Sequence, residues 1–347
     1  MKITDLRSDT VTKPSPQMWE KIKLMGNSQL GDNVMGEDPT VNKLEKKAAQ
    51  LVGKEDALFV ASGTQGNLLS VLSHTQPGDE ILAEEECHIY MDEVGNVARI
   101  GGLMLRTYPS NKGIPDLKLL QTLIRNKEDI HEPPTTLFCV ENTHNFHGGV
   151  PIPPQELKKM RDFTDKNELK FHMDGARLFN AALALDVPVT SLTKYVDSVM
   201  FCLSKGLSCP IGSIVAGNSE FIQRAKKYRK MMGGGWRQAG IIAIFGLVAL
   251  QEDWIGRLKE DHSTTKLLYE GIKSHPLIDV YEPQTNILMT YFPEDAPMEK
   301  IIEDLRKEGV LAFSAGQRIR FVTHYGISPG DIEYAVEKIY SVFSEFM

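Results

Sequence analysis

Two segments of the chain place a chemically reactive side chain directly after an apolar run. Lys205 follows a run of strand length that begins at Val196, and this run stops in a stretch rich in glycine, serine and proline. Asp174 ends a shorter run, residues 170–173, in the same way. Open α/β sheets bind their ligands at the carboxyl ends of the strands, so both side chains are candidates for a binding site. Partial burial favours the neutral, nucleophilic form of a lysine amine, although a lysine that reaches from a strand end into solvent is the alternative.

The spacing of these two residues predicts that they meet at one edge of a sheet. Asp174 precedes Lys205 by 31 residues, which is about the length of one β-α-β unit. A buried carboxylate needs a cationic partner, and Arg177 stands three residues further on. A carboxylate that pairs with a pyridinium nitrogen and a lysine that forms a Schiff base are what a protein contributes to pyridoxal phosphate chemistry. The pair therefore predicts pyridoxal 5'-phosphate as the cofactor.

A third segment has the pattern of an anion-binding turn. Residues 57–61 are predicted to form a strand, and Ser62-Gly63-Thr64 then leads into an apolar helix that runs through Leu72. Free N–H groups at the start of a helix, together with the hydroxyls of Ser62 and Thr64, suit a phosphate. A capped turn with nothing bound is the alternative. The turn matches neither a Walker motif nor a dinucleotide fingerprint, so no nucleotide is implied.

The histidines suggest several roles. His88 follows a predicted strand at residues 80–83, and it is either a structural imidazole or a ring that stacks on the cofactor. His144 and His147 follow another strand, residues 136–141, and resemble metal ligands. No cysteine or further histidine completes a zinc set nearby, so we expect no metal. His131 lies in a loop, where an exposed, inert side chain is the default.

Composition limits the classes of partner. A formal net charge of −7 over 347 residues argues against nucleic acid and acidic membranes as partners. No segment has the ~18 apolar residues of a membrane span, and the amino terminus has no apolar core of signal length. The four cysteines show no CxxC pair and lie in apolar segments, as is typical of reduced thiols in the cytoplasm. We therefore expect a cytoplasmic protein that acts on a small molecule.

The predicted elements describe an α/β protein with a mostly parallel central sheet and a smaller α+β C-terminal domain. We expect a polar, solvated arm at residues 1–16, a large domain at 17–251 and a small domain at 252–347. An apolar helix at residues 239–250 closes the large domain, after the break at Gly233-Gly234-Gly235. Further predicted helices and strands are the helices at 154–166, 220–232, 298–308 and 329–346, and the strands at 213–216, 277–281, 286–291 and 319–323.

Together these features resemble the fold-type I pyridoxal phosphate enzymes, and in detail the threonine aldolases. The resemblance covers nearly the whole chain and depends on blocks that occur in the family's order. These blocks are Arg7-Ser8-Asp9-Thr10-Val11-Thr12, Gly36-Glu37-Asp38-Pro39-Thr40, Ser62-Gly63-Thr64-Gln65, Glu141-Asn142-Thr143-His144, Asp174-Gly175-Ala176-Arg177, Ser204-Lys205-Gly206-Leu207 and Arg320-Phe321-Val322-Thr323-His324.

The resemblance implies a role for each matching residue. Lys205 would hold the cofactor covalently, Asp174 would pair with its pyridine nitrogen, His88 would stack on its ring, and His131 would lie near the substrate hydroxyl. The cofactor phosphate would be bound by Ser62, Gly63 and Thr64, together with Arg237 from a neighbouring subunit. Arg177 would also lie near the cofactor. The substrate carboxylate would be bound by Ser8, Arg177 and Arg320, and Arg320 is favoured over Arg318 for this role.

The implied activity is retro-aldol cleavage of L-threonine or L-allo-threonine to glycine and an aldehyde. The alternative is another reaction on the same cofactor, namely β-elimination, racemisation or transamination. The resemblance also implies a homo-oligomer, a tetramer with the dimer as its minimal unit. Asp32-Asn33-Val34-Met35 stands where the family commonly has Asp-Asp-Val-Tyr, so the preferred substrate and stereochemistry stay open. The base that removes the proton of the substrate β-hydroxyl could be His88, His131 or water, and the sequence does not decide among them.

Overall fold

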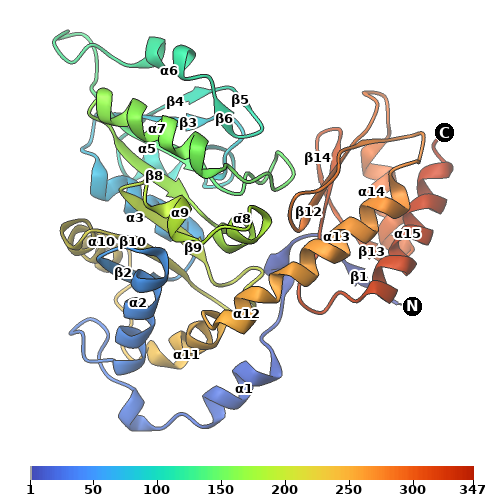
Figure 1. Ribbon diagram of the computed structural model, residues 1–347, viewed down its shortest axis with the longest axis horizontal. Coiled ribbons are helices and arrows are strands. Elements are labelled where there is room, and N and C mark those ends of the chain that lie inside the picture. Colours follow the sequence, from blue (N-terminus) through green and yellow to red (C-terminus); the bar gives the residue numbers. More distant parts are fainter. Residues whose placement is uncertain (1) are drawn as a thin grey trace.

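A seven-stranded sheet forms the centre of the larger part of the molecule (Figure 1). The structure is a computed structural model, and it describes residues 2–347. Strand β10 runs antiparallel to both of its neighbours, and the other neighbouring pairs are parallel. The strands, in their order across the sheet, are β2 (Asp56–Val60), β10 (Ser213–Gly217), β9 (Ser198–Cys202), β8 (Lys170–Asp174), β7 (Thr135–Glu141), β3 (Glu80–Glu84) and β4 (Met104–Tyr108).

Helices cover both faces of this sheet, which explains why its strands read as continuous apolar runs. On β2, Leu58 and Val60 belong to the cluster under α3 and α10, whereas Phe59 belongs to the larger cluster on the other face. The helices of this part are α1 (Pro16–Lys23), α2 (Pro39–Val52), α3 (Gly63–His74), α4 (His88–Met91), α5 (Asn96–Arg99), α6 (Leu117–Leu123), α7 (Pro154–Lys166), α8 (Leu178–Ala184), α9 (Thr190–Thr193), α10 (Ser219–Met231) and α11 (Gly240–Ala249).

A four-stranded antiparallel sheet forms the smaller part, and three helices pack on it around a separate apolar cluster. Its strand order is β11-β12-β15-β14. The elements are α13 (Leu258–Ile272), β11 (Asp279–Val280), β12 (Ile287–Tyr291), α14 (Met298–Lys307), β14 (Phe313–Ala315), β15 (Arg318–Val322) and α15 (Pro329–Ser344).

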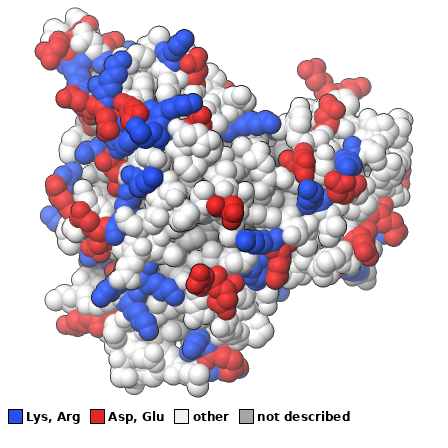
Figure 2. Space-filling model, viewed as in Figure 1, with Lys and Arg blue, Asp and Glu red and all other residues white. Residues whose placement is uncertain are grey.

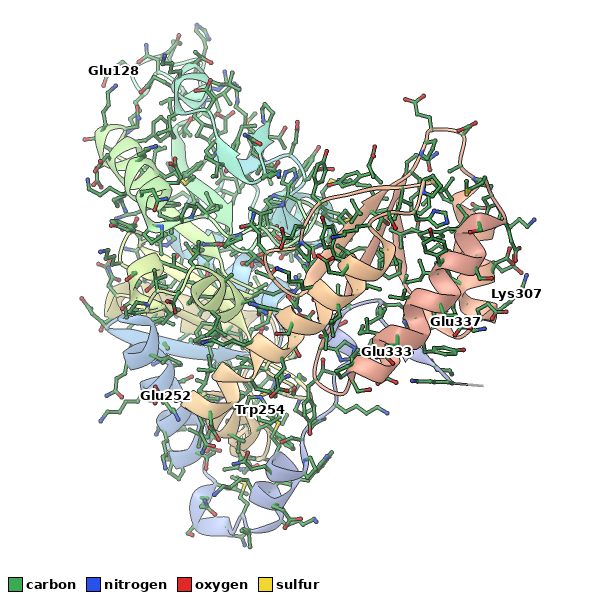
Figure 3. All side chains as sticks on the ribbon, turned by 45° about the vertical axis from the view of Figure 1, so that its right-hand side comes forward. Glu128, Glu252, Trp254, Lys307, Glu333 and Glu337 are labelled. Carbon is green, nitrogen blue, oxygen red and sulfur yellow. The ribbon has the colours of Figure 1, made fainter. Side chains whose placement is uncertain are left out.

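The short helix α12 and the residue that follows it hold the loop that carries Lys205. Figure 3 labels Trp254 on α12 (Glu252–Gly256), just before the long helix α13. The indole Nε1 of Trp254 donates to the Leu207 carbonyl at 3.0 Å, and Arg257 donates to the Gly206 carbonyl at 2.8 Å. These two bonds fix the backbone that follows the candidate lysine.

The expectation that residues 1–16 form a merely solvated arm is wrong. Strand β1 (Thr4–Asp5) pairs in parallel with β13 (Val310–Leu311), so the arm belongs to the small part. Asp9 is fully buried, and Ser15 caps α1 by accepting a hydrogen bond from the Met18 N–H. Polar composition suggested solvation, but each of these polar groups has a partner far away in the sequence or at a helix end.

Most predicted elements agree with the structure, and the differences occur at exposed or short segments. Helix α7 has the predicted bounds, and α2 begins after the predicted cap Asp38 and ends at Gly53 in the left-handed conformation. The strand expected at residues 277–281 is only the two-residue β11. Strand β4 was not predicted, because it lies at the sheet edge and only Tyr108 is buried.

Charged side chains are mixed over the surface. On the face drawn in Figure 2, Lys and Arg lie among Asp and Glu. Many of these charges form exposed pairs such as Lys158–Asp162 at 2.8 Å, which contribute little to stability. Within the described part of the chain, none of the helices has both the length and the apolar character that crossing a membrane requires.

Candidate active site

A pocket of about 250 Å³ lies where the carboxyl ends of the central strands meet the arm and the small sheet. It collects side chains from six stretches of the chain that are far apart in the sequence. Its lining residues are Ser8, Thr10, His88, Asp92, Glu141, Asn145, Phe146, Ala176, Arg177, Lys205, Phe313 and Arg320. Of the predicted site residues, Ser8, His88, Arg177, Lys205 and Arg320 therefore share one cavity.

The predicted meeting of Asp174 and Lys205 at one sheet edge is confirmed at the level of the strands. Strands β8 and β9 are parallel neighbours, and Asp174 is paired with Met200 in their register. Asp174 ends β8, and Lys205 follows the end of β9 by three residues. Asp174 also lies close to the pocket, because its carboxylate and a ring nitrogen of the lining residue His88 are within 4.8 Å of each other.

The expectation that Arg177 is the partner of Asp174 is wrong. The Asp174 carboxylate accepts hydrogen bonds from Asn67 Nδ2 at 2.7 Å and from the Ala176 N–H at 2.9 Å. The turn through Gly175 and Ala176 brings a backbone N–H onto the carboxylate and directs Arg177 elsewhere. A carboxylate has about four acceptor positions, so Asp174 keeps acceptor capacity for a further donor.

Arg177 instead forms a buried ion pair with Asp9. Its Nε and Nη2 donate to the two carboxylate oxygens of Asp9, each at 2.8 Å, in a bidentate arrangement. Burial works against ionisation of Asp9, but the charge and hydrogen bonds of Arg177 outweigh it, so the pKa of Asp9 lies well below its usual value. Nη1 of Arg177 reaches Asn145 Oδ1 at 3.3 Å, which leaves only part of the guanidinium for a ligand.

Of the two arginines in the pocket, Arg320 is the one without a carboxylate partner. Its Nη1 donates to Asn145 Oδ1 at 2.8 Å and its Nη2 to the Arg7 carbonyl at 3.2 Å, so both acceptors are neutral. Its buried Nε has no hydrogen-bond partner among residues 2–347. Burial and the neighbouring charge of Arg177 lower the pKa of Arg320 to about 10. Arg318 pairs with Glu86 at 2.6 Å, which supports the choice of Arg320 as the carboxylate receptor.

His88 is held from two sides. Its Nδ1 lies 2.9 Å from Glu93 Oε1, and its backbone N–H donates to Glu141 Oε2 at 2.7 Å. Burial lowers the pKa of His88, but the hydrogen bond to Glu93 and the charge of Asp174 outweigh this, and the net pKa is raised. Glu93 also accepts from Asn67 Nδ2 at 2.8 Å, so one amide connects the orienting residue of His88 with Asp174.

The anion-binding turn lies at the end of β2 and the start of α3. Ser62 is the N-cap of α3, and its hydroxyl accepts from the Gln65 N–H at 3.1 Å. The first N–H groups of a helix have no partner within it. Ser62, Gly63 and Thr64 do not line the pocket itself, but a Cβ at Gly63 would lie only 3.0 Å from Sγ of Cys202, at the end of β9. The turn is therefore next to the strand that leads to Lys205.

Two predicted residues lie away from the pocket of their own chain. Arg237 is 58% exposed and pairs with Asp32 at 2.7 Å. His131 is exposed, in the loop that precedes β7, and therefore lies at the opposite edge of the sheet from the pocket. Figure 3 labels Glu128 in the same loop, at a far tip of the molecule. Within one chain the structure does not bring His131 or Arg237 to Lys205.

Sequence reasoning missed the residues that hold the site together. Asn67, Glu93 and Asn145 orient Asp174, His88 and Arg320, and Asp9 neutralises Arg177. Asn67 lies shortly after the predicted anion-binding turn. Its amide stands near the start of a mostly apolar helix, and this was the signal in the sequence that could have identified it. Glu93 and Asp9 gave no comparable signal, because Asn67, Arg177 and Asn286, which bind them, are distant in the sequence.

The described residues fit pyridoxal phosphate. An amine and a buried carboxylate with spare acceptor capacity follow the neighbouring strands β9 and β8, and the imidazole of His88 lies near that carboxylate. The charges of Asp174 and Lys205 both act on His88, because Asp174 raises the pKa of His88 and Lys205 lowers it. A helix start suited to the phosphate lies beside them, and Arg320 lacks a charged partner in the way expected of a carboxylate receptor.

Comparison with solved structures gives the class of fold. A threonine aldolase from Leishmania major superposes with a TM-score of 0.84, at 18% identity over 98% of this chain and 99% of the other. A PLP-dependent aminotransferase from Streptococcus suis has a TM-score of 0.76, at 20% identity over 100% of this chain and 94% of the other. The fold is therefore that of the fold-type I pyridoxal phosphate enzymes.

Comparison of sequences gives the family. The family model described as beta-eliminating lyase matches residues 5–295. Low-specificity L-threonine aldolase 1 of Arabidopsis thaliana is 40% identical over 97% of this chain and 95% of its own length. The low specificity L-threonine aldolase of Escherichia coli K12 is 39% identical over 93% of this chain and 94% of its own length. The chain belongs to the threonine aldolases within the beta-eliminating lyase family.

Proposed function

We propose that this protein is a pyridoxal phosphate-dependent lyase that cleaves L-threonine, L-allo-threonine and related β-hydroxy-α-amino acids to glycine and an aldehyde. The observation that carries the proposal is the shared pocket of Lys205, His88 and Arg320, close to the buried carboxylate of Asp174. When bound, pyridoxal phosphate supplies an electron sink for the electron pair that is left at Cα when the Cα–Cβ bond breaks.

Four groups of this chain would hold the cofactor. Lys205 supplies the amine for covalent attachment, and Asp174 accepts a hydrogen bond from the pyridine nitrogen. His88 covers the ring, held in place by Glu93. The start of α3 at Ser62, Gly63 and Thr64 binds the phosphate, with further charge from Arg237 of a second subunit.

Arg320 and Ser8 bind the substrate carboxylate in this proposal. Asn145 accepts from Arg320 and thereby fixes the plane of the guanidinium. Holding the carboxylate would fix the orientation of the substrate at Cα, and this would favour Cα–Cβ cleavage over other reactions. Arg177 is already paired with Asp9, so its contribution to carboxylate binding is the secondary one.

The proton of the β-hydroxyl must pass to a base as the bond breaks. His88 is the histidine in the pocket, and its Nε2 is not used in its bond to Glu93. His131 contributes only if it reaches the pocket of a neighbouring copy. An ordered water is the remaining candidate.

A product assay tests the function. Purified holoenzyme is incubated with L-threonine, L-allo-threonine, or L-threonine plus a 2-oxo acid, and each product is quantified. We expect glycine and acetaldehyde in equal amounts. The proposal is overturned if 2-oxobutanoate with ammonia appears instead, which indicates elimination, or if the amino group is transferred to the oxo acid.

We further propose that the enzyme is a homo-oligomer in the cytoplasm, a tetramer with the dimer as minimal unit. Arg237 is exposed beside the glycine loop, and the side chain of Gln65 lies 3.2 Å from the Cβ position of Gly234 in that loop. Met35 and Ile241 expose apolar surface in the same region, as subunit interfaces do before assembly. The four cysteines are free and buried, which suits a reducing compartment.

A further inference from the structure

A cluster of two histidines and two glutamates lies outside the pocket, at the ends of β3 and β7. Glu84 ends β3, and His144 and His147 lie in the loop after β7. Nε2 of His144 is 2.8 Å from one carboxylate oxygen of Glu84, and Nε2 of His147 is 3.3 Å from the other. The sequence alone predicted no metal here because no cysteine or third histidine was near. The structure supplies a third ligand from a residue 60 positions before His144.

The spacing of these atoms suits a small divalent ion. Zinc binds histidine nitrogen and carboxylate oxygen at about 2.0–2.2 Å, so tetrahedral ligands lie roughly 3.3 Å apart. The ligand atoms of the three residues all lie within 4.8 Å of one another. The separation between His147 and Glu84 already fits, and the separation between His144 and Glu84 would widen by a few tenths of an ångström. Two histidines and one glutamate are also a ligand set that catalytic zinc sites use.

The surroundings of the cluster resemble the outer shell of a metal site. The Glu86 N–H donates to Glu84 Oε2 at 2.7 Å, and the Ser110 hydroxyl donates to Glu84 Oε1 at 2.9 Å. Nδ1 of His147 faces the Glu86 carboxylate at 3.8 Å, and Arg318 holds that carboxylate in place. Carboxylates behind ligand histidines orient the ring and raise its affinity for metal.

The ring nitrogen of His144 that faces Glu84 is Nε2, so an ion bound there leaves the proton of the neutral imidazole on Nδ1. Nδ1 of His144 is buried and has no partner among the described residues, and the His144 side chain is only 1% exposed. His147 is partly exposed and lines a small cavity of about 70 Å³ together with Lys112 and Tyr291. An ion can therefore reach the cluster from the side of His147.

We propose that Glu84, His144 and His147 form a binding site for a divalent transition-metal ion, with zinc as the preferred ion. The remaining coordination positions face Ser110 and the cavity at His147. The loop that carries the two histidines also carries Asn145, which holds Arg320, and it directly follows Glu141, the last residue of β7, which holds His88. The ion fixes this loop between β3 and β7. The inference does not depend on the reaction proposed above.

Cobalt is a suitable probe, since it binds the same ligands as zinc and absorbs in the visible range. Holoenzyme without an affinity tag is treated with a chelator, dialysed and titrated with Co²⁺ in the absence of amino acid. We expect one equivalent per chain to bind, with absorption bands of a low-symmetry cobalt site. We also expect the midpoint of thermal unfolding to rise by several degrees with excess Co²⁺ or Zn²⁺.

Variants locate the ion. His147→Gln and Glu84→Gln each remove a ligand while they keep a hydrogen-bonding side chain, and both should lose the bands and the thermal shift. His131→Gln removes an exposed imidazole elsewhere and should bind as the wild type does. Retained cofactor absorbance and circular dichroism establish that the variants are folded. The proposal is overturned if the wild type binds no Co²⁺, or if His147→Gln and Glu84→Gln bind it unchanged.

Discussion

Two buried arginines in the pocket have different roles because their charges are compensated differently. Arg177 has a bidentate carboxylate partner in Asp9, and its pKa is raised by that partner although burial opposes it. Arg320 has only neutral acceptors, and burial lowers its pKa to about 10. An arginine buried without a counterion is costly unless a ligand supplies the missing charge. This difference supports our proposal that Arg320 is the principal receptor for the substrate carboxylate.

At the scale of single residues, Glu93→Gln tests whether His88 takes part in proton transfer. Glu93 keeps the pKa of His88 raised, so removal of its charge should lower that pKa. If neutral His88 acts as the base, the acid limb of kcat/KM against pH should move to lower pH in the variant. The amide of the variant keeps a hydrogen-bond acceptor near Nδ1, so the ring should stay in place. An unchanged acid limb would show that His88 only covers the cofactor.

At the scale of elements, the amino-terminal arm links the two parts of the molecule. Strand β1 pairs with β13 of the small part, and Asp9 then reaches Arg177 after β8. Asn286 also donates to Asp9 at 3.3 Å, just before β12. The arm is therefore part of the active-site wall, and its polar residues are needed inside the molecule.

Asp9→Asn should destabilise the protein strongly, because it leaves the Arg177 charge buried without a counterion. We expect a loss of about 3–5 kcal/mol in the free energy of unfolding. Asp5→Asn is the matched control, since Asp5 pairs with the exposed Arg7, and it should cost less than about 1 kcal/mol. Urea unfolding measures both variants.

The same pair of variants predicts a pH dependence. The pKa of Asp9 is depressed in the folded protein, so its contribution is present above the ordinary value of 3.8 and is lost as pH falls below it. The stabilities of wild type and Asp9→Asn should therefore converge below about pH 4. A difference that stayed constant down to pH 3 would contradict this account of the ion pair.

The strand ends could be predicted from the sequence, and the contacts between them could not. Lys205, Asp174 and Ser62 each follow an apolar run, so their places at the sheet edge follow from local pattern. The partners Asn67, Glu93, Asp9 and Glu84 depend on which strands become neighbours, and local spacing carries no information on that. Arg177 illustrates the limit, because proximity in sequence suggested Asp174 and the tertiary fold gives it Asp9.

At the scale of the whole molecule, the position of Arg237 predicts complementation between subunits. Lys205→Ala and Arg237→Ala should each be nearly inactive alone. When they are co-expressed, a mixed dimer has one site with an intact Lys205 and an Arg237 from the partner. Random assortment should restore about a quarter of wild-type activity. Without recovery in purified mixed dimers, Arg237 would have to act within its own chain or not at all.

In the proposed site, Lys205 carries the cofactor opposite Asp174. Borohydride reduction of the holoenzyme makes a Schiff base permanent, and mass spectrometry of the digested protein then locates the modified lysine. We predict that the pyridoxyl group is found on Lys205, and that Lys205→Ala treated in the same way carries none. A label on another lysine, or an unlabelled wild type that still cleaves threonine, would contradict the account.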